Sequence, residues 1–134
     1  ITLNGTVYDQ TITKSITGIG NISKRIFTIP ANTTVTLATF ASAVTNNQFD
    51  VEDVRYIRAT NLDDTEPLIL TNAFQTTAAG TELKAGCSTT FLSVNGASGA
   101  SKAGLTTAAA IETLFVHNAH GTNALDPELV IATT

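Results

Sequence analysis

Apolar and polar residues alternate with a period of two along most of the chain, and β-branched residues fill many of these positions. Such alternation is typical of β-strands that bury one face. No segment carries a clear long-helix pattern. About eight short strands separated by turn residues predict an all-β fold, either a two-sheet antiparallel sandwich or a closed barrel. The predicted strands are residues 2–8, 24–29, 33–40, 54–61, 67–72, 88–94, 112–118 and 128–134.

Three segments depart from this pattern. Residues 40–48, "FASAVTNNQ", fit either a helical turn or a crossing loop. Residues 95–110 are rich in Gly, Ala and Ser and predict a long flexible loop, of the kind that is usually functional or mobile. The end of this loop also fits a helix, but a strand from residue 112 is favoured because "TLFV" is bounded like the other strands. Residues 1–10 are interpreted as a possible N-terminal arm.

The sequence contains a faint internal repeat. Residues 28–38, "TIPANTTVTLA", resemble residues 82–93, "ELKAGCSTTFLS", and each is followed by two apolar strands joined through Asn, an acidic turn and Pro. A duplicated unit of four strands would build a jelly-roll-like sandwich. The alternative is that any β-sandwich reuses the same turn residues.

Charge is scarce in this chain of 134 residues, which we expect to form a single domain, 1–134. Only 13% of residues are charged and the net charge is −4, against about 25% charged residues in ordinary soluble domains. The absence of a basic patch argues against nucleic-acid binding, and no apolar run is long enough for a membrane helix. Small polar side chains lose little solvation or rotamer entropy when another protein covers them.

The acidic residues Asp63, Asp64 and Glu66 precede Pro67 between two predicted strands. This combination favours a turn, because Asp side chains bind nearby backbone N–H groups and Pro fixes φ. Neither the spacing of a calcium loop nor bidentate carboxylates from several loops can be read from the sequence. Whether the patch also binds an ion stays open at this point.

Other candidate chemistry is sparse. His117 and His120 lack a third metal ligand in register, and a nucleophilic Cys87 would need a histidine that the local sequence does not supply. We expect Cys87 to be buried and inert at the start of a strand. Glu112, Asp126 and Glu128 are conceivable glycosidase carboxylates, but the chain has no Trp and two Tyr for sugar stacking. We therefore predict no enzyme, no cofactor and no metal.

Several predicted strands are apolar on both faces, and such strands need cover on both sides. In "PLILTN" Ile69 points away from Leu68 and Leu70, and in "ELVIATT" Val130 points away from its neighbours. Because one small domain has little chain left for a third layer, we expect other subunits to supply the cover and the chain to form a homo-oligomer. The hypothetical interface residues are Ile1, Leu3, Val7 and Tyr8 of the arm, with Ile69 and Val130 on the outer faces.

The segments "YIRATNLDDTEPLILT", "LKAGCSTTFLS", "ELVIATT" and the N-terminal "ITLNGTVYDQTITK" resemble small β-sandwich virion structural proteins of tailed bacteriophages, in particular capsid decoration (cement) proteins. The resemblance implies a jelly-roll-like module on the outer capsid surface of a virion, which holds neighbouring major capsid proteins together and has no catalytic residues. The long loop at 95–110 departs from the simple cases. It leaves open a tail, fibre or connector module that binds a host receptor or glycan.

Overall fold

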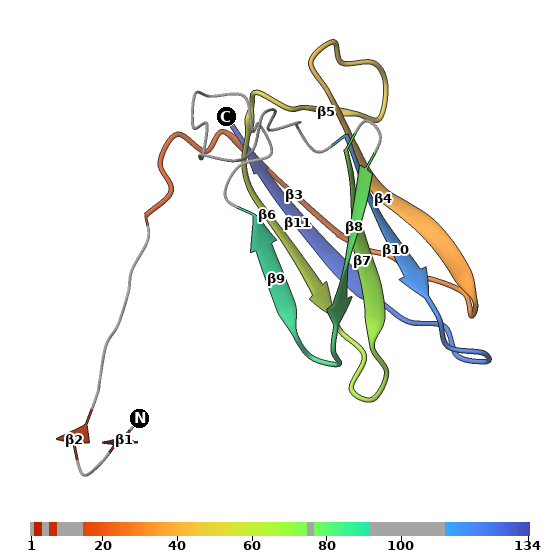
Figure 1. Cartoon of the computed structure of the whole chain (residues 1–134). Coiled ribbons are helices and arrows are strands. Elements are labelled where there is room, and N and C mark those ends of the chain that lie inside the picture. The colour runs from red at the N-terminus through yellow and green to blue at the C-terminus, as the bar shows by residue number, and fades with distance from the viewer. Residues whose placement is uncertain (1, 4–5, 8–14, 75–76, 92–111) are drawn as a thin grey trace.

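In the residues that this computed structural model describes, the regular elements are all strands (Figure 1). The structure describes residues 2–3, 6–7, 15–74, 77–91 and 112–134. The strands are β1 (Thr2–Leu3), β2 (Thr6–Val7), β3 (Asn21–Ile26), β4 (Thr33–Ala41), β5 (Phe49–Asp50), β6 (Val54–Asn61), β7 (Leu68–Phe74), β8 (Thr77–Leu83), β9 (Ser88–Phe91), β10 (Thr113–Asn118) and β11 (Pro127–Thr133).

Two sheets pack face to face. One has the order β5-β4-β10-β7-β8 and the other β3-β11-β6-β9, and every pairing between neighbours is antiparallel except the short parallel contact of β5 with β4. The chain passes from one sheet to the other between β3 and β4, β5 and β6, β6 and β7, β8 and β9, β9 and β10, and β10 and β11. This is the jelly-roll arrangement of two four-stranded sheets, with β5 added at one edge. The predicted all-β sandwich of jelly-roll type is confirmed.

Most predicted strands lie close to the observed ones. The prediction for residues 54–61 matches β6, and the predictions for 33–40, 67–72, 112–118 and 128–134 are within two residues of β4, β7, β10 and β11. These strands carry the clearest alternation because they lie against the core.

Other predicted strands differ from the observed ones. The strand predicted at 24–29 begins earlier, at Asn21, and ends at Ile26. The strand predicted at 88–94 is described only as far as Phe91. β8 was not predicted because "TAAGTEL" consists of small residues around Gly80, and the two-residue β5 carries no pattern. Residues 42–48 form bends and a turn and contain no helix, so the crossing-loop alternative is correct.

The N-terminal prediction of one strand over residues 2–8 is wrong for the part that the structure describes. β1 and β2 pair antiparallel with each other, Thr2 opposite Val7 and Leu3 opposite Thr6. Ile1 and Tyr8 lie outside the described residues. The predicted loop at 95–110 also lies outside them.

The core fills the space between the two sheets. Leu114 and Val116 of β10 and Leu68 and Leu70 of β7 are almost fully buried and face Ile57 and Ile131 of the opposite sheet within one cluster. Burial of each such side chain contributes about 1.5–3 kcal/mol relative to exposure. Phe40 contributes an aromatic contact with Phe49 at 6.0 Å between ring centroids. The core therefore orients the alternate residues of each strand outward.

Candidate functional site

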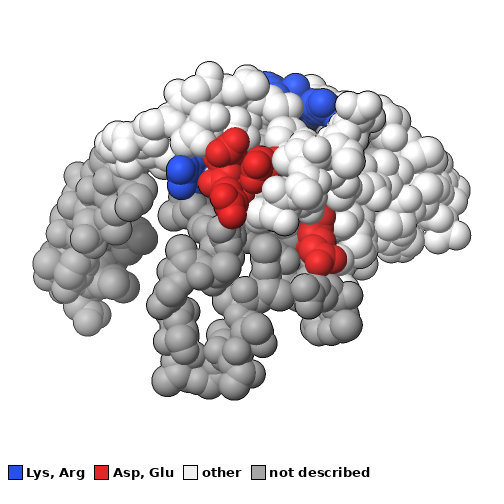
Figure 2. All heavy atoms as spheres, turned by 90° about the horizontal axis from the view of Figure 1, so that it is seen from above, with Lys and Arg blue, Asp and Glu red and all other residues white. Residues whose placement is uncertain are grey.

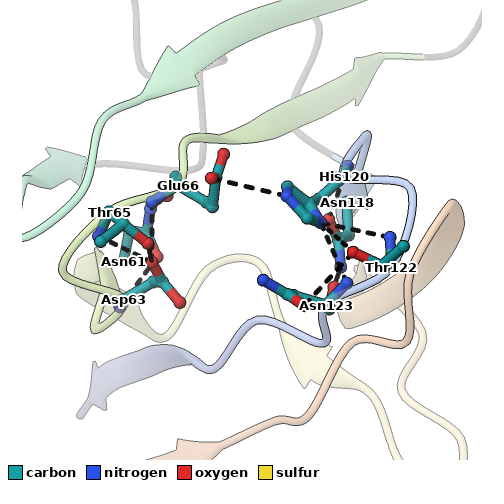
Figure 3. Close-up of polar contacts among 8 residues, drawn as sticks. All are labelled: Asn61, Asp63, Thr65, Glu66, Asn118, His120, Thr122 and Asn123. Carbon is teal, nitrogen blue, oxygen red and sulfur yellow. Dashed lines mark hydrogen bonds and ion pairs between the residues drawn. The ribbon is translucent and has the colours of Figure 1, made fainter.

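Two loops at one end of the sandwich hold the most developed polar network of the described residues (Figure 3). Asn61, at the end of β6, is fully buried. Its Nδ2 donates to the carbonyl oxygens of Glu66 at 2.7 Å and Leu83 at 3.1 Å, and its Oδ1 accepts the N–H of Asp63 at 3.2 Å. The side chain thus ties the β6–β7 turn to the end of β8.

Asn118, at the end of β10, is also fully buried and repeats this geometry. Its Nδ2 donates to the carbonyl oxygens of Asn123 at 2.8 Å, Ile29 at 3.0 Å and Pro30 at 3.2 Å. Its Oδ1 accepts the N–H of His120 at 2.9 Å. In both turns the asparagine binds the N–H two residues ahead and the carbonyl five residues ahead.

Asp63 and His120 follow these asparagines by two residues, and the side chain of each accepts two backbone N–H groups of its own turn. Oδ1 of Asp63 accepts the N–H groups of Glu66 at 2.7 Å and Thr65 at 2.8 Å. Nδ1 of His120 accepts the N–H groups of Asn123 at 2.9 Å and Thr122 at 3.2 Å. Because Nδ1 of His120 accepts these N–H groups, the geometry fits the tautomer with its proton on Nε2.

These contacts affect the pKa of Asp63 and bring His120 close to Glu66. The backbone N–H of Glu66, and then that of Thr65, hold the pKa of Asp63 below its ordinary value of 3.8 because they stabilise the charged carboxylate. Nε2 of His120 lies 3.5 Å from Oε1 of Glu66, which joins the two turns across the end of the sandwich. The acidic patch is therefore built as a turn, as its sequence favoured.

The two preceding turns are also equivalent. Asn32, between β3 and β4, has φ 52°, and Gly86, between β8 and β9, has φ 67°. The N–H of Asn32 donates to the carbonyl of His120 at 3.0 Å, and that of Gly86 donates to the carbonyl of Asp63 at 2.9 Å. If β5 is left aside, exchanging β3 with β8, β4 with β9, β6 with β10 and β7 with β11 converts each sheet order into the other. The four-strand unit suspected from the sequence is repeated in the geometry.

The remaining candidate catalytic groups do not converge into a site among the described residues. Cys87 is exposed, so the prediction of a buried cysteine is wrong, because the turn at Gly86 places it outside the sandwich before β9 begins. His117 faces outward from β10, with Nδ1 3.0 Å from Oγ1 of Thr34. No group of three or more His, Cys, Asp or Glu side chains with metal-binding proximity occurs in the described part of the chain.

The outer face of the β3-β11-β6-β9 sheet is charged. Glu128 of β11 lies 2.8 Å from Nζ of Lys24 on β3 and 2.9 Å from a guanidinium nitrogen of Arg58 on β6. The ammonium of Lys24, aided by the Arg58 guanidinium, holds the pKa of Glu128 below its ordinary value. Val130 lies on this face opposite Lys24 and Arg58 and is half-buried. Its surroundings are therefore more polar than the sequence suggested.

The outer face of the β4-β10-β7-β8 sheet is different, and we call it the low-charge face. Its positions follow from the strand register, since they alternate with buried core residues. They hold one carboxylate, Glu82, and no Lys or Arg. Ile69 is 38% exposed there, as the sequence predicted for an outward position. The low-charge face comprises Thr34, Thr36, Thr39, Ile69, Thr71, Ala73, Ala78, Gly80, Glu82, Thr113, Phe115 and His117.

Seen from the end opposite the paired turns, most of the described surface is neither acidic nor basic (Figure 2). Two exposed residues that the sequence did not single out are Ile22 and Ile26 on the edge strand β3, at 64% and 59% exposure. Ile22 was missed because the predicted strand began at residue 24, and Ile26 lay within that strand without being assigned to its exposed face. The sequence did contain a signal for these exposed positions, since Ile22 and Ile26 stand two residues before and two residues after Lys24. In the described part of the chain, no helix has the length and apolar character needed to cross a membrane.

No family model matches the chain, and no curated protein matches it. One similar solved structure is a chain reported in work on Bacillus endospore appendages, described as a novel family of disulfide-linked pili. It is 14% identical, the match covers 93% of this chain and 98% of that chain, and the TM-score is 0.45.

Proposed function

We propose that this protein is a non-enzymatic structural subunit that binds another protein through its low-charge face. The observation that carries the proposal is the contrast between the two outer faces. One bears Lys24, Arg58 and Glu128, whereas the other bears Thr, Ala, Gly, Ile, Phe and one His with a single carboxylate at its edge strand. Centres of protein interfaces are depleted in Lys, Glu and Asp in the same way.

Burial of this face is energetically favourable for simple reasons. Thr and Ala side chains are short, so they lose little conformational entropy on contact. Ile69 and Phe115 supply apolar area worth about 25 cal/mol per Å² when removed from water. Glu82 lies on β8, the edge strand, where it stays at the rim of an interface and keeps its solvation.

Several of the polar side chains considered above support a structural role because they have structural contacts. Asp63 and His120 bind backbone N–H groups of their own turns, and Glu128 binds two cations. Oε1 of Glu66 lies 3.5 Å from Nε2 of His120.

In its specific form, the proposal is a capsid decoration subunit on the outer surface of a tailed-phage virion, bridging neighbouring major capsid proteins. The jelly-roll sandwich and the sequence segments that resemble this class of protein support it. The N-terminal arm, with Leu3 in β1 and Val7 in β2, is proposed to add contacts to a neighbouring subunit.

The test is the location of the chain in its native source. Intact particles are banded in a density gradient, and the fractions are probed with an antibody to the chain. A decoration subunit bands with the full particles at a fixed ratio to the major capsid protein. Recovery only among free soluble proteins would contradict the proposal. Saturable binding on a glycan array, with recovery in a tail fraction, would favour a receptor-binding module instead.

A further inference from the structure

We propose that two copies of this chain pair through their β3 strands, so that the two β3-β11-β6-β9 sheets form one continuous sheet. This interface is separate from the low-charge face and goes beyond the function proposed above. Among the described residues, strand β3 forms the edge of its sheet, with β11 as its neighbour on one side only (Figure 1). An edge strand presents unpaired N–H and C=O groups, which bind a further strand readily.

The β3 edge lacks two of the usual defences against pairing. Its register with β11 runs from Asn21 to Ile26 without a bulge, and the strand contains no proline. The opposite sheet is better protected on the β4 side, where the two-residue β5 covers the end of β4. Lys24 is a typical defence, but its ammonium is held 2.8 Å from Glu128 of its own sheet.

The exposed residues of β3 show why a second copy fits. Ile22, Lys24 and Ile26 lie on one face, and the two isoleucines are the most exposed large apolar residues in the described chain. They are equally spaced about Lys24. A two-fold axis perpendicular to the sheet at Lys24 therefore sets Ile22 of each copy opposite Ile26 of the other. Apolar cross-strand pairs of this kind stabilise antiparallel sheets.

Charges are compatible with this register. On the opposite face, Arg25 of each copy meets Ser23 of the other, so no like charges face each other there. Lys24 meets Lys24 at the axis, which is unfavourable for free ammonium groups. Each ammonium is paired with the carboxylate of Glu128 in its own sheet, which also binds Arg58, so neither ammonium lacks a counter-charge although the cluster keeps a net positive charge. The strand is thus complementary to itself in its apolar pattern, and its charges do not forbid this register.

The first experiment measures the mass of the full-length chain by light scattering over a range of concentrations. We expect the wild type to dimerise and the double variant I22K/I26K to halve the mean mass. The matched control is S88K/T90K, which adds two lysines to exposed positions of β9, the other edge of the same sheet, and should leave the mass unchanged. If I22K/I26K fails to fold by circular dichroism, I22T/I26T replaces it.

The second experiment tests the register by cross-linking. In a C87S background, which removes the single native thiol, K24C should form a disulfide-linked dimer on mild oxidation, because residue 24 faces itself across the axis. R25C, on the same strand, faces residue 23 and should stay monomeric on a non-reducing gel. A wild type that is monomeric at every concentration, a dimer that survives in I22K/I26K, or equal cross-linking of K24C and R25C would overturn the inference.

Discussion

Asn61 and Asn118 show how two buried amides organise one end of the molecule. Each amide satisfies backbone groups of its own turn and of the facing loop, in places where the turn prevents regular strand pairing. Buried carbonyl groups without such a partner would cost free energy. The sequence showed an asparagine at the end of β6 and another at the end of β10. Because an asparagine before a turn is usually exposed, the burial of these two side chains could not be predicted.

We predict that N118A lowers the free energy of unfolding by about 2 kcal/mol, since unpaired buried polar groups cost about 1–3 kcal/mol. The carbonyl oxygens of Pro30 and Asn123 and the N–H of His120 lose their contact with the amide in this variant, whereas the carbonyl of Ile29 keeps the N–H of Leu125. Urea denaturation measures the change. N123A is the control, because Asn123 is exposed and its backbone contacts remain. Equal stability of N118A and the wild type would contradict the role of this amide.

The carboxylate of Asp63 makes the free energy of unfolding depend on pH. The pKa of Asp63 is lower in the folded chain than in the unfolded chain. Its contribution to the free energy of unfolding is therefore fully present above the pKa of the unfolded state, and it is lost as the pH falls through the pKa of the folded state. We predict that D63N is less stable than the wild type at pH 7 and that the difference shrinks in strong acid. Unfolding midpoints at both pH values test this. A similar pH-dependent loss in D64N would contradict it.

At the scale of elements, the sequence predicted the strands that alternate cleanly and failed where packing decides. β6 was predicted to the residue because its inward and outward positions differ sharply in polarity. β8 was missed because its residues are small, and its pairing with β7 arises from tertiary contacts rather than local preference. The repeat of "PANT" and "KAGC" did carry information, since both turns contain a residue with positive φ.

We predict that G86A destabilises the chain by roughly 1–2 kcal/mol, the cost of a side chain in left-handed backbone. Gly86 has φ +67°, and an added Cβ would meet no atom within 4 Å, so the penalty is conformational and not steric crowding. G121A is the matched control, because its Cβ also meets no atom within 4 Å and its φ is not in the left-handed region. Thermal unfolding distinguishes the two. Equal effects would contradict this account of the turn.

At the scale of the whole molecule, the low overall charge is unevenly distributed. The sequence indicated that outer faces need cover, and it placed Ile69 on such a face. It did not show that the two faces differ, because Lys24, Arg58 and Glu128 are far apart in the chain and meet only through the pairing of β3, β11 and β6. The contrast between faces, and the open β3 edge, depend on topology and could not be read from local patterns.

The most direct test of the low-charge face is binding of single-lysine variants to the native particles. I69K places a charge at the exposed isoleucine of that face, whereas T90K places the same charge on the outer face of the other sheet. Burial of an unpaired charge is costly, and each ~1.4 kcal/mol is tenfold in affinity. We predict that I69K reduces the bound fraction by about tenfold or more while T90K binds as the wild type does. Equal binding of I69K and T90K would contradict the proposal that this face is covered.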